Sequence, residues 1–226
     1  MFLSVLMKLM FLALRTRPDI LLSVNSLATK AKQPTYGDSS RIDRVLGYLK
    51  HTQHIKLVCH VTDLSLKGYF DASHAVYPDM KGVNGILITL GNLGFPIVCK
   101  SSKQKSVYRS STESELGCVF SGSDLLLYIR RLCVFLGSIG KDEAVDIYQD
   151  NTSAIKMSYM GRGSSQSNSK FIDIKYFWLK EHLDNKVFIM KYLQRENMIA
   201  DFFASPRVGK TFSGWRNTIL GIDNDK

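Results

Sequence analysis

Four acidic residues, each in a short motif, are the part of this sequence best suited to chemistry. The motifs end in Asp71 (Gly-Tyr-Phe-Asp), Glu115 (Thr-Glu-Ser-Glu), Asp150 (Tyr-Gln-Asp) and Asp201 (Ile-Ala-Asp). None of the four has a Lys or Arg directly beside it, so converging carboxylates would repel one another unless a cation lay between them. Mg²⁺ prefers hard oxygen ligands of this kind. If the fold brings the four together, they predict a divalent-metal site.

Such a site would suit phosphodiester cleavage, because two metal ions about 4 Å apart can hold the attacking and leaving oxygens without a protein nucleophile. The ligands must then sit on rigid elements. Asp71 lies in a strand pattern, and Asp150 ends a strand and precedes a helix. Glu115 falls in the first turns of a long helix, and Asp201 falls on a short one.

Each acid also has a purely structural explanation. Asp150 could cap the helix that follows it. Two overlapping capping-box patterns, one ending at Glu113 and the other at Glu115, could use either glutamate to hold the helix start. Asp201 could be a surface residue of an amphipathic turn. Asp71 is the hardest to explain this way, because a carboxylate in a strand flanked by aromatic residues is costly to bury unpaired.

The elements that would position these acids follow from hydrophobic periodicity. Helices are expected over residues 1–33, with Pro18 near the start of a second helix, and over residues 39–49. Strands are expected at 55–61, 68–71, 85–90, 95–100, 145–148 and 187–193, and further helices at 110–136, 152–159, 170–183 and 198–203. A Gly/Ser-rich loop covers residues 161–169. This order predicts an α/β fold with a mixed sheet and helices packed on it.

Composition is consistent with a packed core. The 226 residues are 45% hydrophobic and 22% charged, enough for one large domain, or one domain and a small appendage. The net charge is +10, of which residues 1–67 carry +6. A basic chain whose acids cluster in motifs suits a polyanionic ligand, although a solvated basic surface would give the same charge.

Cysteine and histidine spacing excludes several other classes. The four cysteines show no C-x-x-C pattern and lie in apolar runs, so we expect reduced core residues of an intracellular protein. The five histidines show no H-E-x-x-H pattern. Residues 1–14 are apolar, but Lys8 interrupts the run and it is too short to span a bilayer. We therefore expect an amphipathic or core helix there rather than a targeting segment.

Taken together, the motifs of residues 68–221 resemble the ribonuclease H domain of Ty1/copia-type retrotransposon Pol polyproteins. The matching segments are Gly68–Ala75 (GYFDASHA), Lys100–Lys105 (KSSKQK), Arg109–Leu116 (RSSTESEL), Ile147–Ile155 (IYQDNTSAI), Phe171–Tyr176 (FIDIKY) and Glu196–Asp201 (ENMIAD). Upstream, Thr16–Ile20 (TRPDI), Val24-Asn25 and Arg44–Lys50 (RVLGYLK) resemble the end of the reverse transcriptase region.

The resemblance implies a ribonuclease H-like mixed five-stranded sheet flanked by helices, over residues 55–226. It implies that residues 1–54 are a helical remnant of the reverse transcriptase thumb or connection. The implied activity is cleavage of the RNA strand of an RNA–DNA hybrid, with two Mg²⁺ ions, or Mn²⁺, held by Asp71, Glu115, Asp150 and Asp201. The resemblance also implies that the polymerase region of the same polyprotein is a partner. It implies no association with a membrane.

Two departures and two alternatives accompany the resemblance. Ser73 and His74 stand where many relatives carry an acidic and an aromatic residue, and Phe171 replaces a histidine. The polymerase palm, with its paired aspartates, is absent, so a catalytically inactive remnant that binds nucleic acid or packs on a polymerase is the main alternative. A transposase or integrase would typically end its acidic set with a glutamate, whereas this chain has Asp201 there.

Substrate contacts are predicted separately from the metal site. Lys100, Lys103 and Lys105 alternate with Ser and Gln and could follow a phosphate backbone, or simply lie on a solvated loop. Asn151 beside the third acid could bond the hybrid or the Asp150 carboxylate. Arg162 in the Gly/Ser-rich loop could reach the scissile phosphate, or be a surface arginine.

Overall fold

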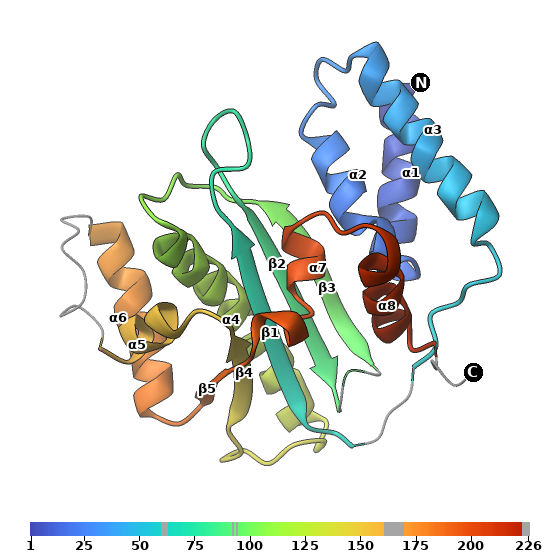
Figure 1. Ribbon diagram of the computed structural model, residues 1–226. Helices are drawn as coiled ribbons and strands as arrows, with labels where there is room; N and C mark the ends of the chain where they lie inside the picture. Colours follow the sequence, from blue (N-terminus) through green and yellow to red (C-terminus); the bar gives the residue numbers. More distant parts are fainter. Residues whose placement is uncertain (60–62, 92, 94, 161–169, 223–226) are drawn as a thin grey trace.

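The computed structural model describes residues 1–59, 63–91, 93, 95–160 and 170–222. Its centre is a five-stranded mixed sheet in the order β3-β2-β1-β4-β5 (Figure 1). The strands are β1 (Leu66–Ser73), β2 (Val83–Leu90), β3 (Pro96–Lys103), β4 (Val145–Gln149) and β5 (Phe188–Tyr192). β2 is antiparallel to its two neighbours, β1 and β3, whereas β4 runs parallel to both β1 and β5. The predicted mixed five-stranded sheet is confirmed.

One face of the sheet packs on three helices, α4 (Ser111–Phe135), α5 (Thr152–Met160) and α6 (Lys170–Asp184) (Figure 1). Side chains alternate between the two faces of a strand, and Phe70 and Ile147 point to this side, where they are fully buried. The Phe70 ring presses on α4 at Gly122, where an added Cβ would lie 2.5 Å from ring carbons. This close approach explains a glycine in the middle of a 25-residue helix.

The opposite face carries a second core, to which Tyr69 and Leu87 contribute. The short helix α7 (Asp201–Ala204) and the helix α8 (Gly209–Leu220) pack there, after a 3₁₀ turn, η3 (Arg195–Asn197). A Cβ at Gly85 of β2 would lie 2.4 Å from the carbonyl oxygen of Ala200, so only glycine lets α7 come this near the sheet. Gly85 is paired with Asp71 across the strands.

The N-terminal helices join this second core. They are α1 (Phe2–Arg15), the 3₁₀ helix η1 (Pro18–Ile20), α2 (Leu21–Ala28) and α3 (Tyr36–His51). Two of the three segments that resemble the end of a reverse transcriptase region, Thr16–Ile20 and Arg44–Lys50, meet here, because Asp19 accepts hydrogen bonds from Arg17 and from the Tyr48 hydroxyl. Buried Leu6 and Leu9 confirm that α1 is a core-packing helix. None of the described helices combines the length and apolar character needed to cross a bilayer.

Most predicted elements are confirmed within a few residues, and α3 begins earlier than expected. It starts at Tyr36 because Thr35 caps it: the Thr35 hydroxyl accepts the Asp38 N–H, and the Asp38 carboxylate accepts the Thr35 N–H. The helix α8 was not predicted at all. The Gly/Ser-rich loop at residues 161–169 lies outside the described residues.

The strand expected over residues 55–61 is wrong for its described part, Ile55–Cys59, which forms no strand. This segment finds no partner strand; instead the Val58 N–H donates to the Leu220 carbonyl at 2.8 Å. All four cysteines are free thiols, and Cys118 and Cys133 are buried as expected. Cys59 is exposed, so the prediction that every cysteine lies in the core is wrong for this residue, which lies in the unpaired segment.

Candidate metal centre

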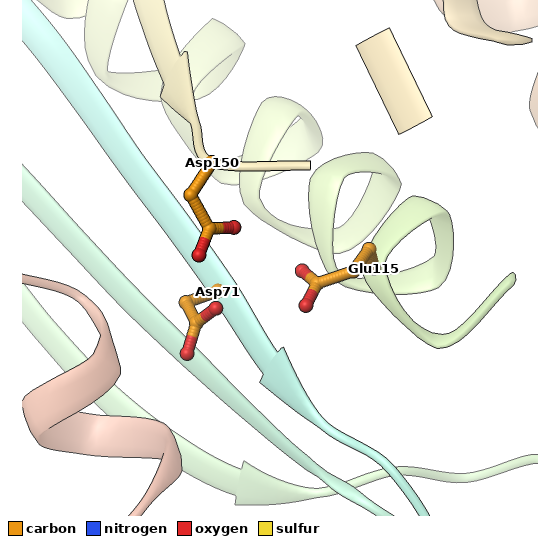
Figure 2. A group of neighbouring side chains, drawn as sticks. All are labelled: Asp71, Glu115 and Asp150. Atoms are coloured by element: carbon orange, nitrogen blue, oxygen red, sulfur yellow. The ribbon is translucent and has the colours of Figure 1, made fainter. Parts of the chain in front are cut away.

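Three of the four predicted acids converge in space. Asp71, Glu115 and Asp150 each offer a carboxylate oxygen, and these oxygens all lie within 4.8 Å of one another. Figure 2 shows the three carboxylates turned toward one another from β1, from α4 and from the residue directly after β4. Asp71 and Glu115 are each only 7% exposed. The arrangement is an acidic cluster, with two members buried and Asp150 half-buried, at one end of the neighbouring strands β1 and β4.

Strand register explains why Asp71 and Asp150 meet. The parallel pairing of β1 and β4 sets Tyr69 opposite Tyr148. Their rings stack at a centroid distance of 4.8 Å and an interplanar angle of 11°, which fixes the register on this face. Because side chains on one face recur every second residue, Asp71 and Asp150 are the next residues on that same face. Two residues far apart in the chain are thereby made neighbours.

The start of α4 decides which glutamate faces the other two acids. The Ser110 hydroxyl accepts the Glu113 N–H at 3.2 Å, and the Glu113 carboxylate accepts the Arg109 N–H at 3.0 Å. Glu113 therefore holds the helix start. Glu115, two residues on, is buried and points inward. The Ser114 hydroxyl donates to the Ser73 carbonyl at 3.3 Å, which ties this end of the helix to the end of β1.

Gln149 belongs to the site, although the sequence analysis did not select it. Its amide Nε2 donates to a Glu115 carboxylate oxygen at 3.0 Å, and its Oε1 accepts the Asp150 N–H at 2.7 Å. The side chain is fully buried. The two-residue period of β4 could have identified Gln149, because the buried positions Val145 and Ile147 continue to Gln149 on the face that packs on α4. A polar amide on that face is unusual enough to suggest a role. Gln149 links two of the three acids and fixes their orientation.

Burial and mutual repulsion make all three acids hard to ionise. Burial raises the pKa of Asp71, and the nearby Asp150 charge raises it further, although Arg195 and Arg207 partly oppose this. The pKa of Glu115 rises because of burial and then because of Asp71 and Asp150. Burial likewise raises the pKa of Asp150. A cation among the three would offset both the burial cost and the repulsion, so the donor set fits a divalent metal ion.

Asp201 is the predicted acid that the structure does not place in this group of three. It is buried at the start of α7, on the sheet face that carries Tyr69 and Asp71, but its carboxylate forms an ion pair with Arg207. The positive charge of Arg207 also opposes the rise in the pKa of Asp71. A metal-ligating role for Asp201 stays a prediction.

The predicted nucleic-acid contacts have mixed surroundings. Lys103 pairs with Asp79 at 2.8 Å and lies 4.5 Å above the Tyr77 ring, whereas Lys100 and Lys105 are exposed. The Asn151 side chain accepts the Ala154 N–H at 3.1 Å and so caps α5. Asn151 thus takes the capping role that was an alternative for Asp150. Arg162 lies outside the described residues, and contact of any of these side chains with nucleic acid stays a prediction.

Comparison with known proteins shows which family this chain is related to. No protein-family model matches the chain. Over 206 residues the chain is 31% identical to the retrovirus-related Pol polyprotein from transposon RE1 of Arabidopsis thaliana, an alignment that covers 90% of this chain and 14% of the relative. The chain belongs to the retrovirus-related Pol polyproteins of transposons. It spans about one seventh of the length of this Pol polyprotein.

Two solved structures superpose on parts of this chain. The foamy viral protease-reverse transcriptase, solved in complex with an RNA/DNA hybrid, superposes with a TM-score of 0.51 at 12% identity, covering 86% of this chain and 24% of that one. RNase H1 from Halobacterium salinarum superposes with a TM-score of 0.44 at 13% identity, covering 62% of this chain and 94% of that one. The mixed sheet with helices on both faces is a ribonuclease H fold, in the Pol region that the sequence motifs indicate.

Proposed function

We propose that this Pol region, of the Ty1/copia type, is a metal-dependent endonuclease that cuts the RNA strand of RNA–DNA hybrids during reverse transcription. The observation that carries the proposal is the convergence of the Asp71, Glu115 and Asp150 carboxylates in a ribonuclease H fold. In this proposal residues 55–226 form the nuclease. Residues 1–54 are the end of the reverse transcriptase region, packed against it.

In this proposal Asp71, Glu115 and Asp150 would hold two Mg²⁺ or Mn²⁺ ions, with Asp201 as the fourth ligand. When bound, such ions supply positive charge that stabilises the negative charge developing on the phosphate oxygens. The chain contributes the ligands and their orientation. Gln149 holds a Glu115 oxygen in place through its amide, and the surrounding burial keeps bulk water from competing for the carboxylates.

The proposed substrate follows from charge and from the relatives. A net charge of +10 on a chain with a concentrated acidic pocket favours a polyanion bound around the pocket. The foamy viral protein that shares this fold was solved with an RNA/DNA hybrid, and we extend that ligand to this chain. Exposed Lys100 and Lys105 are proposed to contact its phosphates, together with Lys103, Asn151 and Arg162.

The second candidate is a catalytically inactive remnant that grips nucleic acid or packs on a polymerase. The ion pair between Asp201 and Arg207 favours it, because this arginine occupies the carboxylate that the nuclease would need as a ligand. Hybrid binding without cleavage in either Mg²⁺ or Mn²⁺ would support the remnant.

A cleavage assay with end-labelled RNA–DNA hybrid separates the two. We expect the wild type to cut the RNA strand in Mg²⁺, and Asp71→Asn to lower the rate on the order of 10³-fold, equal to about 4 kcal/mol of barrier. Asp124→Asn, an exposed acid on α4, is the matched control and should cut normally. Equal rates for Asp71→Asn and the wild type would contradict the assignment, and cutting of duplex DNA alone would contradict the substrate class.

A further inference from the structure

A cleft of about 500 Å³ lies where α2 and α3 approach α7 and α8. In Figure 1 these helices are neighbours on the side of the sheet that carries the second core. Its walls are largely apolar and include Leu22, Val45, Phe202 and Phe212. The cleft is therefore a surface hollow shared between the N-terminal helices and the nuclease sheet.

The cleft adjoins the three carboxylates. Arg207 lines it and also pairs with Asp201, and the charge of Arg207 acts on Asp71. Ala204, a second lining residue, packs directly on Gly85, the cross-strand partner of Asp71. The wall of the cleft at Ala204 and Arg207 therefore lies close to the part of the sheet that carries Asp71.

Three arginines give the cleft a positive edge. Arg41 is 59% exposed at its side chain and makes one weak contact, at 3.3 Å, with Asp38. Arg44 is exposed on the same helix, and the Arg207 Nε is buried without a hydrogen-bond partner among the described atoms. Asp19 is the only acid in the lining, and its carboxylate is already paired with Arg17. Because Arg207 is itself paired with Asp201, the positive charge available to a ligand comes from Arg41 and Arg44.

We propose that this cleft binds an unpaired stretch of the nucleic acid that is engaged at the carboxylates. A hollow of this volume cannot admit a duplex, but it can take one or two nucleotides. Apolar walls suit bases, and an arginine edge suits the phosphates between them. The inference rests on the proposed function, because the bound strand is the one presented to the metal centre.

The test measures binding rather than cutting. Fluorescence anisotropy in metal-free buffer compares a blunt RNA–DNA hybrid with the same hybrid carrying single-stranded overhangs of about four nucleotides. We expect the overhang to tighten binding by the wild type roughly tenfold, because its bases would stack on the apolar walls of the cleft. In Arg41→Ala/Arg44→Ala most of this gain should disappear. The slope of log affinity against log salt should fall by about one for each lost phosphate contact.

Arg131→Ala/Lys141→Ala is the matched control, because it removes the same charge from exposed positions at the far end of α4 and in the loop that follows. This control should still bind the overhang hybrid about tenfold more tightly than the blunt hybrid. The inference is overturned if the wild type shows no gain, if Arg41→Ala/Arg44→Ala keeps it, or if the control loses it equally. Circular dichroism and thermal melting check that both variants fold.

The same measurements distinguish a failure of the nuclease proposal from a failure of the cleft proposal. If the wild type does not cut a blunt hybrid in Mg²⁺ but shows the arginine-dependent overhang gain, the nuclease proposal fails and the cleft proposal stands. If cutting of the blunt hybrid is normal and the overhang gain is absent, the cleft proposal alone fails.

Discussion

Two regions of this protein bury acidic side chains in opposite ways. In the N-terminal helices, buried Asp19 accepts two hydrogen bonds from the Arg17 guanidinium, at 3.0 and 2.8 Å, and a third from the Tyr48 hydroxyl at 2.6 Å. Asp38 is capped by Thr35 and paired with Lys30, and the hydrogen bonds from Thr35 lower the pKa of its carboxyl to about 2. These acids are satisfied by their neighbours.

In the sheet, Asp71, Glu115 and Asp150 face one another, and the pKa of each is raised by burial and, for Asp71 and Glu115, also by the other acids. The difference separates a structural acid from a functional one. Charges that stabilise a fold are neutralised within it, whereas a metal centre keeps its negative charge in excess and depends on a ligand to balance it. Substitutions in the two regions should therefore change stability in opposite directions.

The largest change in stability is expected at the paired acid. Asp19→Asn removes one charge of a buried ion pair and leaves the Arg17 guanidinium without its counterion. We expect the free energy of unfolding to fall by about 3–5 kcal/mol. Urea denaturation measures this, with Asp184→Asn as the control, because the exposed Lys180–Asp184 pair should contribute no more than about 0.5 kcal/mol. Equal small losses in both variants would remove the contrast between the two regions.

The opposite sign is expected at Asp71 in metal-free buffer. Its pKa is raised to about 7 in the folded protein. As the pH rises from about 4 to about 7, the unfolded chain therefore loses this proton first, and the wild type becomes less stable. Asp71→Asn removes that cost. It should be more stable than the wild type by on the order of 2–3 kcal/mol at pH 8, with little difference at pH 4.

Urea denaturation in EDTA at the two pH values tests this, and Mg²⁺ should reverse the order at pH 8 by stabilising only the wild type. If Asp71→Asn were the less stable protein at pH 8 without metal, the carboxylate would be a satisfied structural acid like Asp19.

A smaller effect is expected at the residue that joins the acids. Gln149→Leu removes the donor to Glu115 and leaves the buried Asp150 N–H without its acceptor, which should cost about 1–2 kcal/mol of stability. Because Glu115 is then free to rotate, affinity for Mn²⁺ should fall by about tenfold or more. Electron paramagnetic resonance of free Mn²⁺ measures that affinity. Unchanged affinity would mean that Gln149 only fills space.

Local sequence pattern predicted the parts of the site that depend on regular elements. Asp71 lies in a strand pattern and Asp150 directly follows one. Because β1 and β4 pair in parallel, residues at the same distance beyond the Tyr69–Tyr148 pair become neighbours. Gln149 could have been found by the same two-residue period. The ion pair between Asp201 and Arg207 could not, because the two residues are joined by the turn at Ser205-Pro206, whose path depends on packing against the sheet.

The errors elsewhere have similar causes. Residues 55–59 carry an apolar pattern, but a strand also needs a partner, and this segment pairs with neither edge strand of the sheet, β3 or β5. The helix α8 contains Gly, Ser and Thr, which have low helix propensity, and it forms because Ile219 is buried in the second core and Phe212 and Trp215 pack against that core. In both cases tertiary packing decided what local propensity could not.

Metal binding itself tests the central claim most directly. Isothermal titration of Mn²⁺ into the metal-free protein should show saturable binding by the wild type, with an affinity that weakens as the pH falls because protons compete for the three carboxylates. Asp71→Asn and Glu115→Gln should each abolish most of this binding, while Asp124→Asn should retain it. No binding by the wild type, or equal binding by all four proteins, would contradict a metal centre at Asp71, Glu115 and Asp150.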